Sequence, residues 1–210
     1  MRSAADDRTA RAVIRDEALR LFAERGPDAV TVRQIAAAAG VSPALVVHHF
    51  GSKEGLRQAV DQHVLALFDA MLGELTGGRA RDLYDPAASG SLAEAILTYL
   101  PPGSPVPAYL RRMLLAGGGA GRELFGRLFR LSSGMLTGLV AAGLAVPGQD
   151  PAVRAAFLLC NDLAVLLLRE HIGAALGTDP LSGEGIARWA REMLVIYGSG
   201  LLASPPGDPP

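Results

Sequence analysis

Apolar residues recur every three or four positions along nearly the whole of this 210-residue chain. That spacing gathers apolar side chains on one face of a helix, as for Ile14, Ala18 and Phe22 near the amino end. We find no run in which apolar and polar residues alternate between hairpin turns, which is the pattern of a strand. The sequence therefore predicts an all-α fold.

Local turn signals divide the amino-terminal part into short helices. Thr31, with Gln34 three residues later, has the form of a capping box that begins a helix. Gly40 is suited to the left-handed conformation that ends that helix, and Ser42-Pro43 begins the next one as an N-cap and a first helical residue. Two short helices thus meet across a tight turn, and a long fourth helix follows after Gly51-Ser52.

A glycine- and proline-rich break at residues 77–90 separates the fourth helix from the rest of the chain. We expect residues 1–55 to form one domain, residues 56–204 a second, larger helical domain that the long fourth helix enters, and residues 205–210 a disordered tail. Glycine-rich residues 117–121 are expected to form a flexible connection. The further helices are predicted at about 92–100, 109–115, 124–139, 152–176 and 186–202.

The overall charge does not indicate a nucleic-acid partner. Twenty Lys and Arg residues against 21 Asp and Glu residues leave a formal net charge of −1, so DNA binding must depend on a local motif. The single cysteine, Cys160, excludes an intramolecular disulfide and a site built from several thiolates, as suits a reducing compartment. Because the amino end is charged and lacks an apolar signal segment, we expect a cytoplasmic protein.

Residues 31–50 have the layout of a helix-turn-helix, in which the second helix enters the major groove of DNA. On that second helix Val46 and Phe50 are four residues apart and should face the core. The opposite face would then contact DNA, and His48 is its main polar side chain. The candidates on this face are Pro43, Ala44, Val47 and His48.

Three stretches carry this pattern in one register: Thr31 to Ala36, Ala39 to Pro43 and His49 to Glu54. Together with the first helix they resemble the TetR family of bacterial regulators over roughly residues 8–60. The resemblance implies a three-helix DNA-binding domain joined to a carboxyl-terminal ligand-binding and dimerisation bundle. It further implies a homodimer that binds double-stranded operator DNA at a palindromic site, as a ligand-responsive regulator of the repressor type.

The same resemblance assigns DNA contacts to four polar residues. Arg33 reaches a base edge or the adjacent phosphate, and Thr31, Ser42 and Lys53 hold the backbone. Arginine can pair with guanine through two hydrogen bonds, and hydroxyls and helix N-termini are good phosphate ligands. The family usually places a phosphate-binding tyrosine where this chain has Val47. We therefore expect fewer phosphate anchors than in relatives and a strong reliance on Arg33.

In the resembled family the last two helices of each chain form the dimer interface, which here correspond to segments within 152–176 and 186–202. A small molecule, expected to be largely apolar, would bind among the carboxyl-terminal helices. Asn161 and Asp162 interrupt an apolar helix, where buried polar groups need partners. They either orient the ligand or form hydrogen bonds in the dimer or to a neighbouring helix. The candidate ligand contacts are Met71, Tyr109, Met113, Phe129, Phe157, Asn161 and Asp162.

Two other functions fit the sequence less well. An all-helical enzyme acting on a small apolar molecule would use His63, Glu123 or His171, but these lack the spacing of a catalytic or metal site. The adjacent His48 and His49 point in different directions from a helix, which disfavours one shared metal ion. An architectural DNA-binding protein without an effector is the other alternative. We predict no catalytic activity, no cofactor and no metal.

Overall fold

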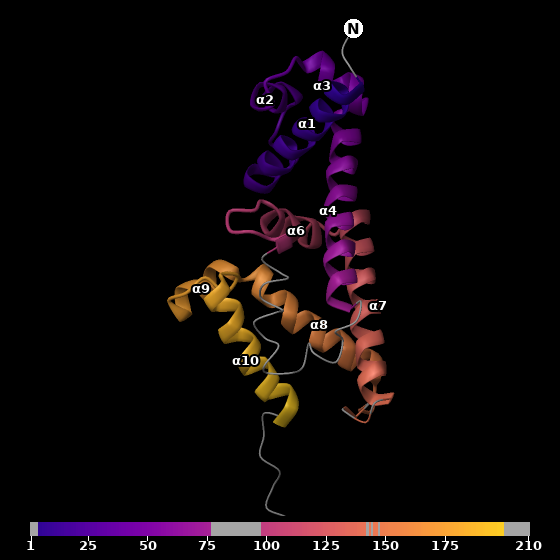
Figure 1. Cartoon of the computed structure of the whole chain (residues 1–210), viewed down its shortest axis with the longest axis vertical. Coiled ribbons are helices and arrows are strands. Elements are labelled where there is room, and N and C mark those ends of the chain that lie inside the picture. Colours follow the sequence, from indigo (N-terminus) through magenta and orange to yellow (C-terminus); the bar gives the residue numbers. More distant parts are fainter. Residues whose placement is uncertain (1–3, 77–97, 142, 144, 147, 200–210) are drawn as a thin grey trace, which may run out of the picture. The chain divides into compact units, whose positions relative to one another are not determined.

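The structure, a computed structural model, describes residues 4–76, 98–141, 143, 145–146 and 148–199 (Figure 1). These residues form nine helices and no strand, which confirms the predicted all-α fold. The break at 77–90, most of the predicted helix at 92–100 and the tail at 205–210 lie outside the described residues.

Three helices, α1 to α3, lie at the amino end of the chain, and the long helix α4 and helices α6 to α10 follow them. Helix α1 contacts α2, α3 and α6, while α2 also contacts α3 and α6 contacts α7. The bounds are Ala4–Arg25 for α1, Val32–Ala38 for α2, Pro43–Phe50 for α3, Lys53–Thr76 for α4, Val106–Leu115 for α6, Gly119–Ala141 for α7, Pro151–Leu167 for α8, Arg169–Leu176 for α9 and Gly183–Ser199 for α10.

Two compact units account for the chain. Residues 1–70 and 103–166 form the first unit, and residues 71–102 with 167–210 form the second. Helix α6 and α7 therefore belong with the amino-terminal helices in the first unit. The division into domains at residue 55 stays a prediction.

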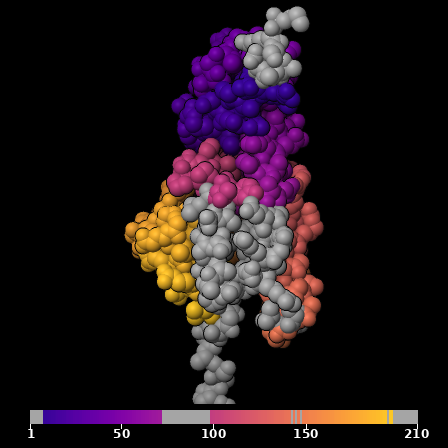
Figure 2. Space-filling view, in the orientation of Figure 1, coloured from indigo at the N-terminus to yellow at the C-terminus, as the bar shows by residue number. Residues whose placement is uncertain are grey.

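A small apolar core holds α1, α2 and α3 against the start of α4. Ile14 and Phe22 of α1, Ile35 of α2, Val46 of α3 and Leu56 of α4 are each at most 1% exposed. Burying a side chain of this size contributes about 1.5–3 kcal/mol to folding. The space-filling view shows these helices, coloured indigo to purple, packed into one continuous body (Figure 2).

The predicted single helix over 152–176 is wrong, because the chain leaves helical geometry at Leu168, where φ is −108° and ψ is 18°. Helix α8 ends before this residue and α9 begins after it. The Arg169 guanidinium at the start of α9 forms two hydrogen bonds to the Asp179 carboxylate, at 2.9 and 2.5 Å. This contact holds α9 against the following loop. The spacing of apolar residues, from which the helix was predicted, cannot reveal such an ion pair.

The glycine-rich stretch at 117–121 is only partly a loop, since α7 begins at Gly119. Gly121 is buried where α7 meets α6, and a Cβ added there would collide with the carbonyl oxygen of Met113. Here glycine serves a close helix contact rather than flexibility.

Among the described helices no single one is long and apolar enough to cross a membrane, and α8 with α9 pass that test only when taken together across their break.

Candidate nucleic-acid interface

The helix-turn-helix is built by the local signals that the sequence contains. The Thr31 hydroxyl accepts a hydrogen bond from the Gln34 backbone N–H at 3.3 Å, and the Gln34 side chain accepts one from the Thr31 N–H at 2.8 Å. Gly40 has a φ of +66°, and the Ser42 hydroxyl accepts from the Leu45 N–H at 3.2 Å. The predicted capping box, left-handed glycine and N-cap are thus confirmed.

Helix α3 turns two different faces to the core and to solvent. Val46 is buried and Phe50 is half-buried, as expected from their spacing. The opposite face leaves Val47 48% exposed. Arg33 on α2 is exposed as well, so the side chains expected to reach base edges are accessible in the free chain. The exposed residues of α3 are Pro43, Ala44, Val47 and His48.

Two of the residues expected to hold phosphates have partners within the chain. The Lys53 ammonium donates to the Asp28 carbonyl oxygen at 3.3 Å, across 25 residues of sequence. The Thr31 hydroxyl donates to the Gln34 side-chain oxygen at 3.0 Å. Lysine has three donors, so Lys53 can hold Asp28 and a phosphate together. Thr31 offers a phosphate no free hydroxyl proton unless its capping contact rearranges.

The reading helix is fixed closely to α4. The Gly51 N–H, at the carboxyl end of α3, donates to the Val47 carbonyl at 2.8 Å. Gly55 in the first turn of α4 lies so near this end that an added Cβ would collide with the Phe50 carbonyl oxygen. The two helices therefore meet backbone to backbone, with no side chain between them.

A groove of about 320 Å³ lies where α1 faces α4, beside the end of α3. Three arginines of α1 line it at spacings of three and four residues, which place them on one helix face. The Arg11 guanidinium stands 5.3 Å from the centre of the Phe50 ring, within cation–π range. The lining residues are Arg8, Arg11, Ala12, Arg15, Phe50, Ala59, Gln62 and His63.

The arginine spacing was a usable sequence signal that our predictions missed. Arg8, Arg11 and Arg15 stand three and four positions apart, but none of them was among the predicted DNA contacts. What the spacing could not show is that Ala59, with its small side chain, lies opposite and leaves room for a groove.

Part of the positive charge in the groove is compensated by Asp16. Arg15 forms an ion pair with Asp16, at 2.7 Å. The His63 ring nitrogen lies 4.0 Å from the same carboxylate. Burial, and secondly the charge of Arg15, lower the pKa of His63 below its ordinary value. At neutral pH His63 is therefore mainly an uncharged hydrogen-bonding group.

Helix α6 is joined to both α1 and α4 by polar contacts. The Tyr109 hydroxyl donates a hydrogen bond of 2.6 Å to the Asp61 carboxylate of α4, and both residues are buried. The Arg112 guanidinium donates to the carbonyl oxygens of Ala23 and Glu24, each at 2.9 Å. These carbonyls lie in the last turn of α1, where a cation is favoured. A displacement of α6 would thus also displace α1 and α4, the helices that support α3.

Burial raises the pKa of the Asp61 carboxyl, and the Tyr109 hydrogen bond and the Arg57 charge oppose that rise only in part. Burial and the contact with Asp61 raise the pKa of Tyr109 as well. Tyr109 therefore stays a hydrogen-bond donor across the physiological range.

The seven predicted ligand contacts differ in how far they are buried. Tyr109 and Met113 are buried on α6, Met71 is buried on α4, and Phe129 on α7 is half-buried. Phe157 on α8 is instead 70% exposed. The role of all seven in ligand binding stays a prediction.

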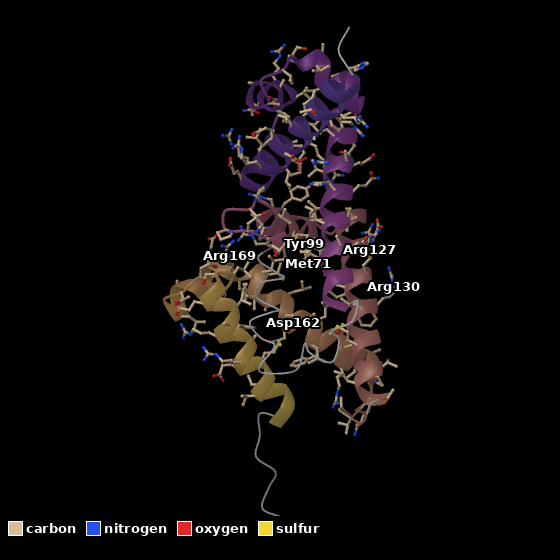
Figure 3. The ribbon with its side chains drawn as sticks, in the orientation of Figure 1. Met71, Tyr99, Arg127, Arg130, Asp162 and Arg169 are labelled. Carbon is tan, nitrogen blue, oxygen red and sulfur yellow. The ribbon has the colours of Figure 1, made fainter. Side chains whose placement is uncertain are left out.

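Asn161 and Asp162 were expected among buried apolar groups, and both are exposed in the single chain. Figure 3 shows Asp162 on α8. Whether they face a ligand, the dimer interface or a neighbouring helix stays a prediction.

The three residues considered for catalysis lie on separate helices. His63 is on α4, Glu123 on α7 forms an ion pair with Arg127 at 2.6 Å, and His171 on α9 is exposed. Among the described residues there is no group of His, Cys, Asp and Glu side chains that could hold a metal ion.

Comparison with known proteins places this geometry in a family. Residues 14–60 match the family model described as bacterial regulatory proteins, tetR family, and residues 103–203 match the model of a tetracyclin repressor-like C-terminal domain. The HTH-type transcriptional regulatory protein RaaS of Mycobacterium tuberculosis is 40% identical over 160 residues, which are 75% of this chain and 69% of RaaS. The chain belongs to the TetR family. It is a transcriptional regulator with a DNA-binding helix-turn-helix.

Solved structures agree with the TetR-family fold. FadR from Bacillus subtilis, in complex with stearoyl-CoA, matches with a TM-score of 0.64 and 16% identity over 91% of this chain and 99% of FadR. AibR, in complex with isovaleryl coenzyme A and operator DNA, matches with a TM-score of 0.60 and 21% identity over 90% of this chain and 98% of AibR. At these identities the likeness establishes the fold alone.

Proposed function

We propose that this TetR-family regulator is a cytoplasmic repressor that binds a palindromic operator as a homodimer and is released by a small, largely apolar molecule. The observation that carries the proposal is the exposed face of α3, supported on α1 and α4, which in turn are joined to α6 by Arg112 and Tyr109. This arrangement connects a DNA-reading surface to the domain that would bind the effector.

The reading surface fits the dimensions of DNA. An α-helix with its side chains is about 10–12 Å in diameter, and the major groove of B-DNA is about 12 Å wide, so the eight-residue helix α3 can enter it. Arg33 supplies a fork of donors that matches guanine, and His48 adds a polar group on α3. Val47 can offer a thymine methyl only apolar contact.

The homodimer is supported by exposed apolar side chains on the two helices expected at the interface. Val153 and Phe157, four residues apart on α8, are 63% and 70% exposed. Val195 and Ile196 on α10 are 59% and 43% exposed. Exposed apolar side chains that are neighbours on one helix, as in these two pairs, are typical of surfaces that a partner covers. A second copy would set the two reading helices about 34–36 Å apart, as successive major grooves require.

The effector would act through α6. A ligand that binds one position of α6 better than another shifts the population of that position. Because α6 holds α1 through Arg112 and α4 through Asp61, the shift changes the spacing of the two α3 helices in the dimer. FadR was solved with stearoyl-CoA and AibR with isovaleryl coenzyme A. The apolar part of these molecules is the acyl chain, and free fatty acids of different chain length are therefore the first effectors to test.

Binding of the full chain to the duplex that flanks its own gene tests the proposal. Fluorescence anisotropy should show salt-dependent binding. Arg33→Ala should weaken it by about 5- to 150-fold for each chain of the homodimer, the equivalent of one bidentate base contact per chain worth about 1–3 kcal/mol. Arg130→Ala, at an exposed position of α7, is the matched control and should bind as the wild type does. If no duplex from that region is bound at low salt and Arg33→Ala changes nothing, the proposal fails.

A further inference from the structure

The groove between α1 and α4 carries a positive charge that neither the helix-turn-helix pattern nor the reading face of α3 explains. Arg8, Arg11 and Arg15 line it, and none of its described lining residues is acidic. In a chain with a formal net charge of −1, three arginines on one helix face are a local concentration of positive charge. Such a concentration attracts anions whatever the sign of the whole molecule.

The three arginines differ in how far their charge is already compensated. Arg15 is paired with Asp16 at 2.7 Å. Arg8 and Arg11 are exposed and form no ion pair within the part of the chain that the structure describes. Arg11 stacks against Phe50, which fixes its guanidinium while leaving its N–H donors available. The free positive charge of the groove is therefore that of Arg8 and Arg11.

The groove borders the reading helix. Phe50 is the last residue of α3 and lines the groove, and it follows the exposed Val47 and His48 by only two or three residues. That separation is about 3–5 Å along the helix axis. A helix lying in the major groove has a phosphate backbone on either side of it, so groups just beyond its reading residues meet phosphates rather than bases. Figure 1 shows α3 beside the amino-terminal part of α1, where Arg8 and Arg11 lie.

We propose that Arg8 and Arg11 bind backbone phosphates of duplex DNA at the edge of the site that α3 reads. This inference rests on the proposed function. The two arginines make up for the anchors that are weak elsewhere in the interface, where Val47 cannot donate a hydrogen bond and the Thr31 hydroxyl proton is engaged with Gln34. Arg15, held by Asp16, contributes little.

The open shape of the groove favours a phosphate of DNA over an enclosed ligand. Its volume of about 320 Å³ is at the lower end of the range for pockets that bury a small molecule. Two of its three arginines are exposed rather than enclosed. A backbone phosphate needs only to be laid across such a surface, where arginine can donate two N–H groups to its oxygens.

The test is the salt dependence of binding by the full-length dimer, measured by anisotropy on a selected operator duplex and on an unrelated duplex of equal length. Each phosphate contact contributes about −0.9 to the slope of log K against log salt. Arg8→Gln and Arg11→Gln should each reduce the magnitude of the slope by about 2, because a homodimer loses one contact from each chain, and the double variant should reduce it by about 4. Both duplexes should be weakened by the same factor, at least about tenfold at 0.1 M salt for the double variant.

Arg25→Gln is the matched control. Arg25 is exposed on the same helix, at its far end and about 25 Å from Arg8. This variant should keep the wild-type affinity and slope, and Arg15→Gln should lie near it. The double variant Arg8→Lys, Arg11→Lys keeps the charge and should keep most of the wild-type slope. Thermal melting shows whether each variant is folded. If substitution of Arg11 destabilises the protein through its contact with Phe50, the slope of the single Arg8→Gln variant tests the phosphate contact instead.

A folded double variant with the affinity and slope of the wild type would overturn the inference. If Arg33→Ala still weakens operator binding in that case, the proposed function stands without the phosphate contacts. If the wild type binds neither duplex at low salt, the proposed function itself fails. Inorganic pyrophosphate that perturbs NMR signals of the groove, with unchanged DNA binding by the variants, would assign the groove to a free anion and also overturn the inference.

Discussion

The Tyr109 hydroxyl donates a hydrogen bond of 2.6 Å to the Asp61 carboxylate and so joins α6 to α4 inside the first compact unit. Burial raises the pKa of Asp61 above its ordinary value of 3.8. A carboxyl group whose pKa is raised in the folded state favours folding when it is protonated. Its contribution is fully present below pH 3.8 and is lost as the pH rises through the raised, folded-state pKa.

The variant Asp61→Asn tests this linkage. Relative to this variant, the wild type should lose stability as the pH rises from about 4 to 7, because the wild type must ionise a buried group that the variant lacks. Urea unfolding at several pH values measures the difference. A difference that is constant with pH, or one that grows in favour of the wild type towards pH 7, would contradict the assignment.

Removing the Tyr109 hydroxyl should lower the free energy of unfolding more than removing the Asp61 charge does. Tyr109→Phe leaves the Asp61 carboxylate buried without the Tyr109 hydroxyl, which should lower the free energy of unfolding by about 1–3 kcal/mol at pH 7. The loss should shrink towards pH 4, where Asp61 is protonated more easily. Tyr109→Phe in the Asp61→Asn background is the control and should show a smaller change, since no charge is then left without its donor.

Arg112 should affect both stability and the response to an effector. Arg112→Met keeps much of the packing volume but removes two hydrogen bonds to the last turn of α1. We expect a loss of about 1.5–3 kcal/mol in unfolding free energy and a weaker effect of any effector on DNA binding. Arg130→Met, at an exposed position of α7 labelled in Figure 3, should change neither quantity. Full effector release by a folded Arg112→Met variant would exclude the contact from the coupling.

Val47 offers a gain-of-function experiment. Its side chain is 48% exposed on α3, and Val47→Tyr would add a hydroxyl within reach of a phosphate. We expect several-fold tighter binding to operator and unrelated duplexes alike, since one hydrogen bond contributes about 0.5–1.5 kcal/mol. Val47→Phe adds the ring without the hydroxyl and separates the two effects. Equal affinities for the Tyr and Phe variants would show that the ring, not a phosphate contact, is responsible.

Phe157 is the residue with which to test the dimer. It is 70% exposed on α8, and Phe157→Glu would place a charge in the proposed interface, where an unpaired charge is strongly unfavourable. Sedimentation should show a shift from dimer to monomer and a loss of tight operator binding. Phe125→Glu on α7, a residue that is 37% exposed, makes the same substitution outside the interface and should stay dimeric. A dimeric Phe157→Glu protein would place the interface elsewhere.

The parts of the fold that the sequence predicted are those set by neighbouring residues. Thr31 and Gln34 form their capping box, Gly40 adopts a positive φ, and Val46 is buried because of contacts within a few residues of each position. Each of these depends on backbone chemistry that a short stretch of sequence contains.

The parts that escaped prediction depend on distant contacts. Lys53 reaches the carbonyl of Asp28, and Arg169 reaches Asp179 and marks the break between α8 and α9. The arginine groove likewise needed knowledge of what lies opposite α1.

The close approach of Gly55 to the Phe50 carbonyl has a mechanical consequence. With no side chain between α3 and α4, the two helices have little freedom to move relative to each other. The reading helix α3 therefore moves together with α4. Helix α4 has 24 residues, a rod of about 36 Å, so a tilt of about 5° about one end carries the other end by about 3 Å. A rotation that small can move a guanidinium out of hydrogen-bonding range of a base, and only glycine at position 55 keeps the two helices close enough to transmit it.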